Sequence, residues 1–169
     1  MRSVTAATLL SLLALAACSR PASSSDQPAS PAEPAAAPEP AAMTDADKKA
    51  ALADLPAVYQ SADLDDGQMK FAICKSCHTT AEGAPDMTGP NLHGIFGRKA
   101  GTKPGFNFSD AMKGYGQVWD PASLDKYLEN PRALVPGTKM TYAGQADAKA
   151  RADLIAYLKV ATSSPPKKG

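Results

Sequence analysis

The sequence predicts a single all-α domain, on three observations. Two segments, at 120–131 and 147–160, space their apolar residues at helical intervals between clear start and stop signals. No segment shows the alternation of a strand, and aromatic residues occur only from Tyr59 onward. The chain of 169 residues therefore has room for one packed domain of about 100 residues, which excludes a large multidomain enzyme.

The segment 120–131 carries the signals of a short helix. Asp120 is a good N-cap, Pro121 suits the first helical position, and Asn130 followed by Pro131 stops the helix. The apolar side chains on its inner face are Leu124, Tyr127 and Leu128.

The segment 147–160 predicts a longer helix with an apolar stripe. The members of the stripe are Ala150, Leu154, Tyr157, Leu158 and, just beyond the segment, Ala161. We expect it to pack on Gly67 and Phe71 of a helix that leads into Cys74. Because Gly67 has no side chain, the two helices can cross closely.

Charge and cysteine content narrow the function. The formal net charge is +1, and residues 62–161 carry 12 Lys or Arg against 11 Asp or Glu. The positive field that holds nucleic-acid backbones is therefore missing, and we expect no nucleic-acid partner. Three cysteines cannot all pair within one chain and are too few to staple a chain of this length, so at least one has another role.

Residues 1–17 have the features of an exported leader. Arg2 supplies the positive start, and the apolar run that follows ends at Cys18, short of the roughly 20 residues that span a bilayer. Residues 15–17, Leu-Ala-Ala, resemble a bacterial lipobox before Cys18. We expect 1–17 to be a lipoprotein signal peptide and a lipid on Cys18 to anchor the protein to a membrane of the bacterial periplasm, inner or outer. The alternative is a plain signal peptide with an incidental cysteine.

Residues 18–61 are expected to hold the lipid anchor, a linker and a short N-terminal extension. Of the 25 residues at 19–43, 19 are Pro, Ala or Ser, a composition that cannot bury a core. As a coil this linker spans roughly 27 Å, and as extended polyproline about 75 Å. The stretch 44–55 is compatible with a helix at the surface. The packed domain is then 62–161, followed by a flexible tail at 162–169.

The motif Cys74-Lys-Ser-Cys77-His78 carries the chemistry. Two cysteines at this spacing alone also fit zinc or thioredoxin-like sites. Zinc needs two further ligands, but only His93 and the lipobox cysteine Cys18 remain, and a thioredoxin-like site needs a βαβ pattern that the sequence lacks. With the adjacent histidine, the motif fits one haem c bound covalently through Cys74 and Cys77, with the His78 imidazole on the iron.

A second axial ligand must come from elsewhere in the chain. The candidates are Met69, Met87, Met112, Met140, His93 or no residue at all. We expect Met69 in core packing, and Met87 lies only nine residues after His78, which demands a very tight loop. Met140 follows Pro136 and Gly137 in a helix-free stretch that can present a thioether to the iron. We therefore favour His78 and Met140 as the metal ligands.

Six motifs follow one another along the packed domain. They are Cys74-Lys-Ser-Cys77-His78, Thr88-Gly-Pro-Asn-Leu-His-Gly-Ile-Phe-Gly-Arg-Lys99, Trp119, Tyr127-Leu-Glu-Asn-Pro131, Pro136-Gly-Thr-Lys-Met-Thr-Tyr-Ala-Gly144 and Asp153-Leu-Ile-Ala-Tyr-Leu-Lys159. In this order they resemble class I cytochrome c of the mitochondrial and bacterial c2 type. The resemblance implies the class I cytochrome c fold, with helices wrapped around one covalently bound haem c.

The resemblance also implies supporting roles on the two faces of the haem. The Pro90 carbonyl accepts a hydrogen bond from the His78 imidazole, which strengthens the imidazole as a donor to iron. Tyr127 and Thr138 hold the Met140 side of the haem. Tyr127 as an ordinary core aromatic remains the alternative.

The haem edge is where the sequence both matches and departs from the family. By resemblance, Arg98 and Trp119 steady a buried propionate, although Trp119 also fits a plain core position. Phe108 stands where the family usually has Tyr and removes a polar group. Met112 replaces the Asn of mitochondrial members, and Tyr142 replaces their Phe over the haem crevice, so the effect of these three residues on the haem site is left open.

The expected function is one-electron transfer rather than catalysis. With two protein ligands on the iron, no open position is left for a small-molecule substrate. The resemblance is to membrane-attached cytochromes that carry electrons from a quinol-oxidising bc1-type complex to a terminal cytochrome oxidase. Lys75, Lys99, Lys113 and Lys139 are candidates for docking acidic partners, or ordinary surface lysines. The alternatives are a haem peroxidase or gas-binding domain with a labile sixth ligand, and a structural haem module without redox exchange.

Overall fold

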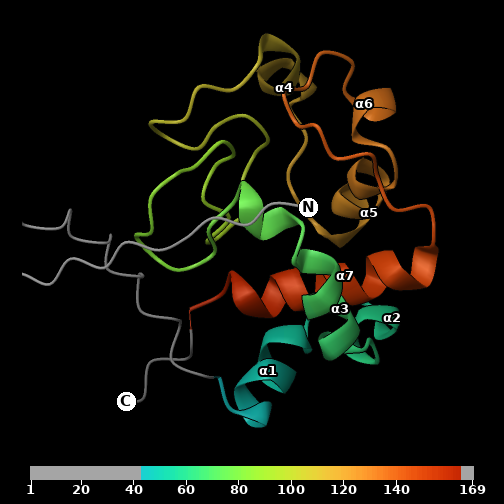
Figure 1. Ribbon diagram of the computed structural model, residues 1–169. Helices are drawn as coiled ribbons and strands as arrows, with labels where there is room; N and C mark the ends of the chain where they lie inside the picture. The colour runs from blue at the N-terminus through green and yellow to red at the C-terminus, as the bar shows by residue number, and fades with distance from the viewer. Residues whose placement is uncertain (1–42, 165–169) are drawn as a thin grey trace, which may run out of the picture. The chain divides into compact units, whose positions relative to one another are not determined.

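Helices are the main regular structure of the chain. The computed structural model describes residues 43–164, and in that range it has seven α-helices, one 3₁₀ turn and no strand beyond a single bridge between Lys99 and Val118. The elements in chain order are α1 (Asp45–Leu52), α2 (Ala57–Gln60), α3 (Leu64–Phe71), η1 (Cys74–Ser76), α4 (Asp110–Tyr115), α5 (Pro121–Glu129), α6 (Pro131–Leu134) and α7 (Ala148–Ala161) (Figure 1). The all-α prediction is confirmed. The expected leader, Cys18, the linker up to residue 42 and the tail beyond 164 lie outside the described residues.

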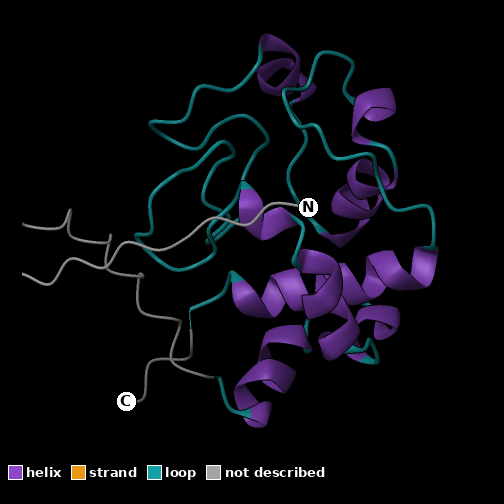
Figure 2. Ribbon diagram, viewed as in Figure 1, coloured by secondary structure: helices purple, strands orange, loops and turns teal. Residues whose placement is uncertain are grey.

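Long loops make up much of the domain on the side away from α1. The chain between η1 and α4 is without helix, and so is the segment between α6 and α7 (Figure 2). These two segments contain the two longest of the motifs singled out above, at 88–99 and 136–144. In residues 43–164 no helix is both long enough and apolar enough to cross a bilayer.

Helix α5 starts and ends at the expected residues. The Asp120 carboxylate accepts a hydrogen bond from the Ser123 amide (2.7 Å), the Ser123 hydroxyl accepts one from the Asp120 amide (2.8 Å), and Pro121 occupies the first helical position. Asn130 ends α5, but it also begins α6, because its side chain accepts from the Ala133 amide (3.1 Å). Four residues are too few to show helical periodicity, and α6 was therefore not predicted.

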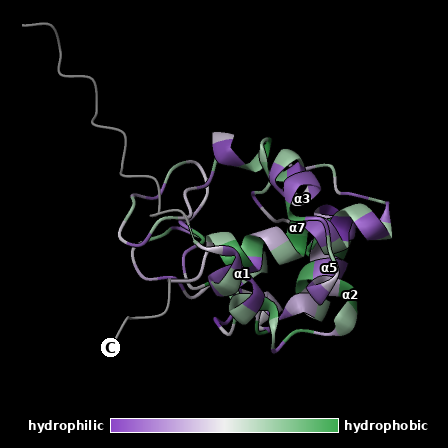
Figure 3. Ribbon diagram, turned by 90° about the horizontal axis from the view of Figure 1, so that it is seen from below, coloured by the Kyte–Doolittle hydropathy of each residue, from purple (hydrophilic) through white to green (hydrophobic). Residues whose placement is uncertain are grey.

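Helix α7 is the centre of the helical half of the domain. Helices α1, α2, α3 and α5 all pack against it (Figure 3). It is therefore buried on nearly every side, with Ile155 and Ala156 fully inaccessible, rather than along one stripe as the sequence predicts. Arg151 ties its first turn to α5, because the guanidinium meets Asp125 at 2.8 Å and also donates to the Gln145 and Ala146 carbonyls.

The crossing of α3 over α7 depends on Gly67. A Cβ atom at this position would overlap the Asp153 carbonyl oxygen and lie 2.7 Å from the Cβ of Tyr157. One turn later, the Phe71 and Tyr157 rings lie 5.5 Å apart. The predicted close crossing is confirmed.

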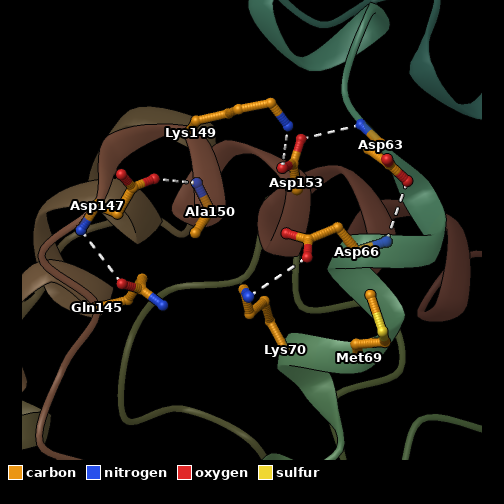
Figure 4. A pocket seen from close by; sticks show the side chains of 9 residues that line it. All are labelled: Asp63, Asp66, Met69, Lys70, Gln145, Asp147, Lys149, Ala150 and Asp153. Carbon is orange, nitrogen blue, oxygen red and sulfur yellow. Dashed lines mark hydrogen bonds and ion pairs between the residues drawn. The ribbon is translucent and has the colours of Figure 1, made fainter.

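A buried carboxylate locks the same crossing at its N-terminal end. The Asp153 side chain accepts a hydrogen bond from the Asp63 amide (2.9 Å) and another from the Lys149 ammonium (2.6 Å), as Figure 4 shows. Asp63 in turn caps α3 through the amides of Asp65 and Asp66. The start of α3 is thereby fixed to the first half of α7.

The packed core reaches further toward both termini than the sequence predicts. Thr44 caps α1 in a reciprocal arrangement with Asp47, as a helix at 44–55 requires, but the segment is more than a surface extension. Leu52, Leu55 and Tyr59 are buried in the core, so packing begins before residue 62. At the other end, Thr162 is buried, and its carbonyl accepts from the Gly94 amide (2.8 Å). The expected flexible tail therefore does not begin at 162.

Gly67→Ala tests the helix crossing. The added methyl group must push α3 away from α7, so we expect a loss of about 1–3 kcal/mol in the free energy of unfolding, measured by denaturant titration. Gly114→Ala in α4 is the matched control. Its Cβ would meet no neighbour, and it should stabilise the protein by up to about 1 kcal/mol. Equal stability of the two variants would contradict the crossing described here.

Candidate functional site

A cavity of about 640 Å³ lies between η1, the loop that follows it, α5, α7 and the loop before α7. This volume is in the range of small-molecule and cofactor sites. All nine residues that the sequence assigns to the haem line it: Cys74, Cys77, His78, Pro90, Arg98, Trp119, Tyr127, Thr138 and Met140. Its lining contains no aspartate or glutamate and is rich in aromatic and aliphatic side chains.

The two cysteines enter the cavity from the tight turn of η1. The amides of Cys77 and His78 both donate to the Cys74 carbonyl, at 3.0 and 2.9 Å, which sets the spacing of the three side chains. Neither cysteine is in a disulfide. Burial, and next the neighbouring Cys77, raise the pKa of the free Cys74 side chain to about 11, so before any covalent attachment its sulfur is a thiol at neutral pH.

The His78 imidazole is held in one orientation. Its Nδ1 donates to the Pro90 carbonyl oxygen at 2.7 Å, and because a carbonyl can only accept, the ring proton lies on Nδ1. Burial lowers the pKa of His78, against the smaller opposite effect of this hydrogen bond. The ring is therefore neutral near pH 7, with Nε2 free of a proton and able to bind a metal.

Gly89 provides the space for this ring. A Cβ atom there would overlap Cε1 of His78 and lie 2.7 Å from both ring nitrogens. The Gly89 amide also donates to the Cys77 carbonyl (2.8 Å), so the backbone lies directly against the imidazole. Sequence reasoning missed Gly89, although its place next to Pro90 in the second motif was an available signal.

Met140 lies on a loop that is bonded to α5 through side chains. The Tyr127 and Thr138 hydroxyls are 3.1 Å apart, and the Thr138 hydroxyl accepts from the Met140 amide (3.3 Å). Burial raises the pKa of Tyr127, so its hydroxyl stays protonated. The Lys139 ammonium donates to the Asn107 carbonyl (2.9 Å), which joins this loop to the one that precedes α4.

Backbone contacts fix both ends of the same loop. At its start the Thr138 amide donates to the Val135 carbonyl (2.9 Å), and at its end the Gln145 amide donates to the Leu128 carbonyl of α5 (2.8 Å). Gly144 lies so close to α5 that a Cβ atom there would overlap the Glu129 carbonyl oxygen. The loop is thus anchored on either side of Met140.

Arg98 and Trp119, which the resemblance assigns to a propionate, both line the cavity. Arg98 is partly buried and donates to the carbonyls of His93 (3.2 Å) and Asn91 (3.3 Å). Burial lowers its pKa and the charge of Asp86 opposes this, but a guanidinium stays charged at neutral pH. Trp119 lies against the Tyr127 ring at 5.0 Å and also faces the cavity, so it is a core aromatic and a wall of the site at once.

The structure separates the candidates for a second axial ligand. Met69 and Met87 are 66% and 47% exposed and do not line the cavity, so the expected core role of Met69 is wrong. His93 faces Glu82 and Ser164 outside the cavity. Met112 is buried and lines the cavity together with Met140.

The three departures from the family pattern also lie at the cavity wall. Phe108 packs edge-on against Phe106, with the ring centroids 4.7 Å apart, and Met112 is a buried residue of the same lining. Tyr142 keeps its proton, because burial raises its pKa. Leu154 and Leu158 of α7 also line the cavity. The apolar stripe of α7 that packs against α3 therefore also forms part of the cavity wall.

Comparison with known proteins decides the family. The sequence profile of the cytochrome c family matches residues 64–162. This chain belongs to the cytochrome c family. Cytochrome c2 of Rhodomicrobium vannielii is 49% identical over 109 residues, which cover 64% of this chain and 87% of that protein. Cytochrome c2 of Rhodoplanes tepidamans is 48% identical over 96 residues (57% and 90%), and cytochrome c of Sesamum indicum is 49% identical over 90 residues (53% and 81%).

Membership in the cytochrome c family settles the cofactor and the class of protein. The chain carries one haem c, attached covalently through Cys74 and Cys77. The cavity fits this group, because it presents both thiols, a neutral imidazole and a thioether in one largely apolar wall, with Arg98 as a cation. The class I cytochrome c fold is confirmed, and the protein transfers electrons and is not an enzyme.

Gly89→Ala tests the support of the imidazole. The new methyl group must turn the His78 ring and break its hydrogen bond to Pro90, so we expect a changed visible absorption spectrum of the haem-loaded protein. Gly83→Ala is the control in the same loop. Gly83 has a φ of +73° and open space around it, so an alanine strains the backbone without touching His78. A spectrum altered equally by both substitutions would show that loop strain, not ring contact, is responsible.

Proposed function

We propose that the protein is a lipid-anchored one-electron carrier of a bacterial periplasmic respiratory chain, which accepts electrons from a quinol-oxidising bc1-type complex and delivers them to a terminal oxidase. The observation that carries this proposal is that His78 and Met140, 62 residues apart in the chain, line one cavity that also contains the haem cysteines. Family membership supports electron transfer, and the cytochromes c2 among the relatives support a bacterial carrier.

His78 and Met140 are proposed as the two axial ligands. Bound haem supplies the one-electron couple between Fe(II) and Fe(III). The neutral Nε2 of His78 and the soft thioether of Met140 would occupy both axial positions, and the thioether favours the reduced state. With both positions taken, the cavity offers no place for peroxide or a gas, so the carrier function is favoured over a peroxidase or gas-binding function.

The remaining assigned residues are proposed to support the ligands and the haem periphery. Pro90 fixes the imidazole tautomer, and Tyr127 with Thr138 holds the backbone at Met140. Arg98 offers a partly buried positive charge to a propionate, and Trp119 lines the same cavity.

The chain before the domain is proposed to keep this carrier at a membrane. Residues 1–17 act as a lipoprotein signal peptide, Cys18 receives the lipid, and the Pro, Ala and Ser-rich stretch serves as a tether. Since residues 62–161 carry a net charge of only +1, tethering holds the carrier near its partners where long-range attraction is weak.

Met140→Leu tests the axial ligand. Loss of the thioether should abolish the charge-transfer band between methionine sulfur and ferric iron, lower the reduction potential by on the order of 100 mV, and allow rapid carbon monoxide binding. Visible spectroscopy with redox titration measures all three. Met112→Leu is the matched control, because Met112 is the other thioether in the cavity lining. If Met112→Leu loses the band and Met140→Leu keeps it, the ligand assignment is wrong.

Cys18→Ser tests the anchor. Without a lipid site the carrier should move from the membrane fraction to the soluble periplasmic fraction, as followed by haem staining after cell fractionation. Ser19→Ala keeps the cysteine and should stay with the membranes. Retention of the Cys18→Ser protein with its leader still attached would contradict lipid anchoring.

A further inference from the structure

An ion pair between Asp86 and Lys103 joins two loops at the wall of the haem cavity. The Lys103 ammonium lies 2.8 Å from one oxygen of the Asp86 carboxylate and donates to the other oxygen at 3.0 Å. The Lys103 side chain is only 20% exposed and that of Asp86 25%. Water therefore screens this pair less than it screens an ion pair on the open surface.

Lys103 contributes a positive charge to the lining of the cavity. Four basic residues line it, and no aspartate or glutamate does. The four are Arg98, Lys99, Lys103 and Lys139. Within residues 43–164, Lys103 is the one of these four that forms an ion pair. Because Asp86 is not part of the lining, a group bound in the cavity meets the ammonium of the pair rather than the carboxylate.

The Asp86 carboxylate is fixed in place by a second bond. It accepts a hydrogen bond from the Asn91 amide at 2.7 Å, and Asn91 follows Pro90, whose carbonyl holds the His78 imidazole. The bond from Asn91, and next the bond from Lys103, lower the pKa of Asp86, so the carboxylate is charged at neutral pH. Asp86 thus holds the Lys103 ammonium against a backbone segment that is itself part of the haem site.

We propose that Lys103, positioned by Asp86, is a second cationic residue at the haem in addition to Arg98, and that this ion pair tunes the reduction potential of the iron. One electron converts Fe(III) to Fe(II) and lowers the charge of the haem by one. A nearby cation therefore favours the reduced state, and a nearby anion favours the oxidised state. The proposal depends on the attached haem, and not on the redox partners or the axial ligands proposed above.

A purely structural clamp between the two loops is the competing explanation, and substitutions of similar shape separate the two. Asp86→Asn keeps a side-chain oxygen that can accept from the Asn91 amide but removes the negative charge. Lys103→Met keeps an unbranched chain but removes the positive charge. A clamp predicts that both substitutions shift the potential in the same direction, because both loosen the same loops. A charge effect predicts opposite directions.

The test is redox titration of the haem-loaded full-length chain, followed by visible absorption, for the two single variants and the double variant. The matched controls are Asp66→Asn and Lys70→Met. These two residues form another partly exposed ion pair (3.3 Å) on α3 and line a separate pocket (Figure 4). Denaturant titration of every variant measures the free energy of unfolding in parallel.

We expect Asp86→Asn to raise the equilibrium constant for haem reduction by a fixed reference couple about three- to tenfold, and Lys103→Met to lower it about three- to tenfold. The double variant restores the charge balance and should lie within about twofold of the parent. Both controls should also stay within about twofold, because their charges lie outside the cavity lining. The visible bands should not change, since the substitutions touch no axial ligand.

Three results overturn the proposal. Shifts of Asp86→Asn and Lys103→Met in the same direction, with a loss of stability in both, identify the pair as a structural clamp. Single variants that stay within about twofold of the parent remove any effect of the pair on the haem. Altered visible bands in Asp86→Asn show that the carboxylate acts on His78 through the backbone at Pro90 and not through its charge.

Discussion

The close crossing of α3 over α7 is the constraint on which the rest of the domain depends. Gly67 allows the α3 backbone to touch the Asp153 carbonyl, and the Asp153 carboxylate holds the first residue before α3 through the Asp63 amide. Because α3 leads directly into Cys74, this crossing sets where both haem cysteines enter the cavity. The same helix α7 presents Leu154 and Leu158 to that cavity. One helix pair thus positions the covalent attachment and the wall opposite it.

Hydrogen bonds to backbone carbonyls and hydroxyls, more than ion pairs, position the groups around the cavity. His78 is held by the Pro90 carbonyl, Arg98 by two carbonyls, and the Met140 backbone by the Thr138 hydroxyl. Such partners carry no net charge and do not titrate near neutral pH. The orientation of these side chains is therefore insensitive to ionic strength and to moderate changes of pH.

The features that could be predicted from the sequence are those with local signals or a compact motif. Asp120 and Pro121 set the start of α5 by short-range capping, and the Cys-x-x-Cys-His motif indicated haem without knowledge of the fold. Helix α4 also had signals, because Ser109 caps it and Gly116 ends it with a φ of +68°, but they were not used. The exposure of Met69 could also have been predicted. Gly67 and Phe71 face α7, and a residue two positions from each of them points to the opposite side of the helix.

Other features depend on contacts between residues that are distant in the sequence, and no local sequence pattern predicts them. Leu52 ends a short helix next to a low-complexity linker, and Leu55 follows that helix. Packing against α7, about 100 residues later, makes this segment part of the core. The wall of the cavity also contains residues whose role depends on contacts that no local pattern indicates. The sequence named nine residues for it from motifs, whereas Gly89 matters only because the His78 ring lies against its backbone.

The anchoring of the Met140 loop at both ends affects the rate at which the protein can exchange an electron. Gln145 and Gly144 fix its end against α5, while Thr138 is bonded to Val135 and Tyr127 near its start. A loop held in this way cannot relax by itself when the charge at the site changes, because any movement must carry α5 with it. The nuclear rearrangement that accompanies gain or loss of an electron is therefore small, and a small inner reorganisation energy permits rapid exchange during a brief encounter.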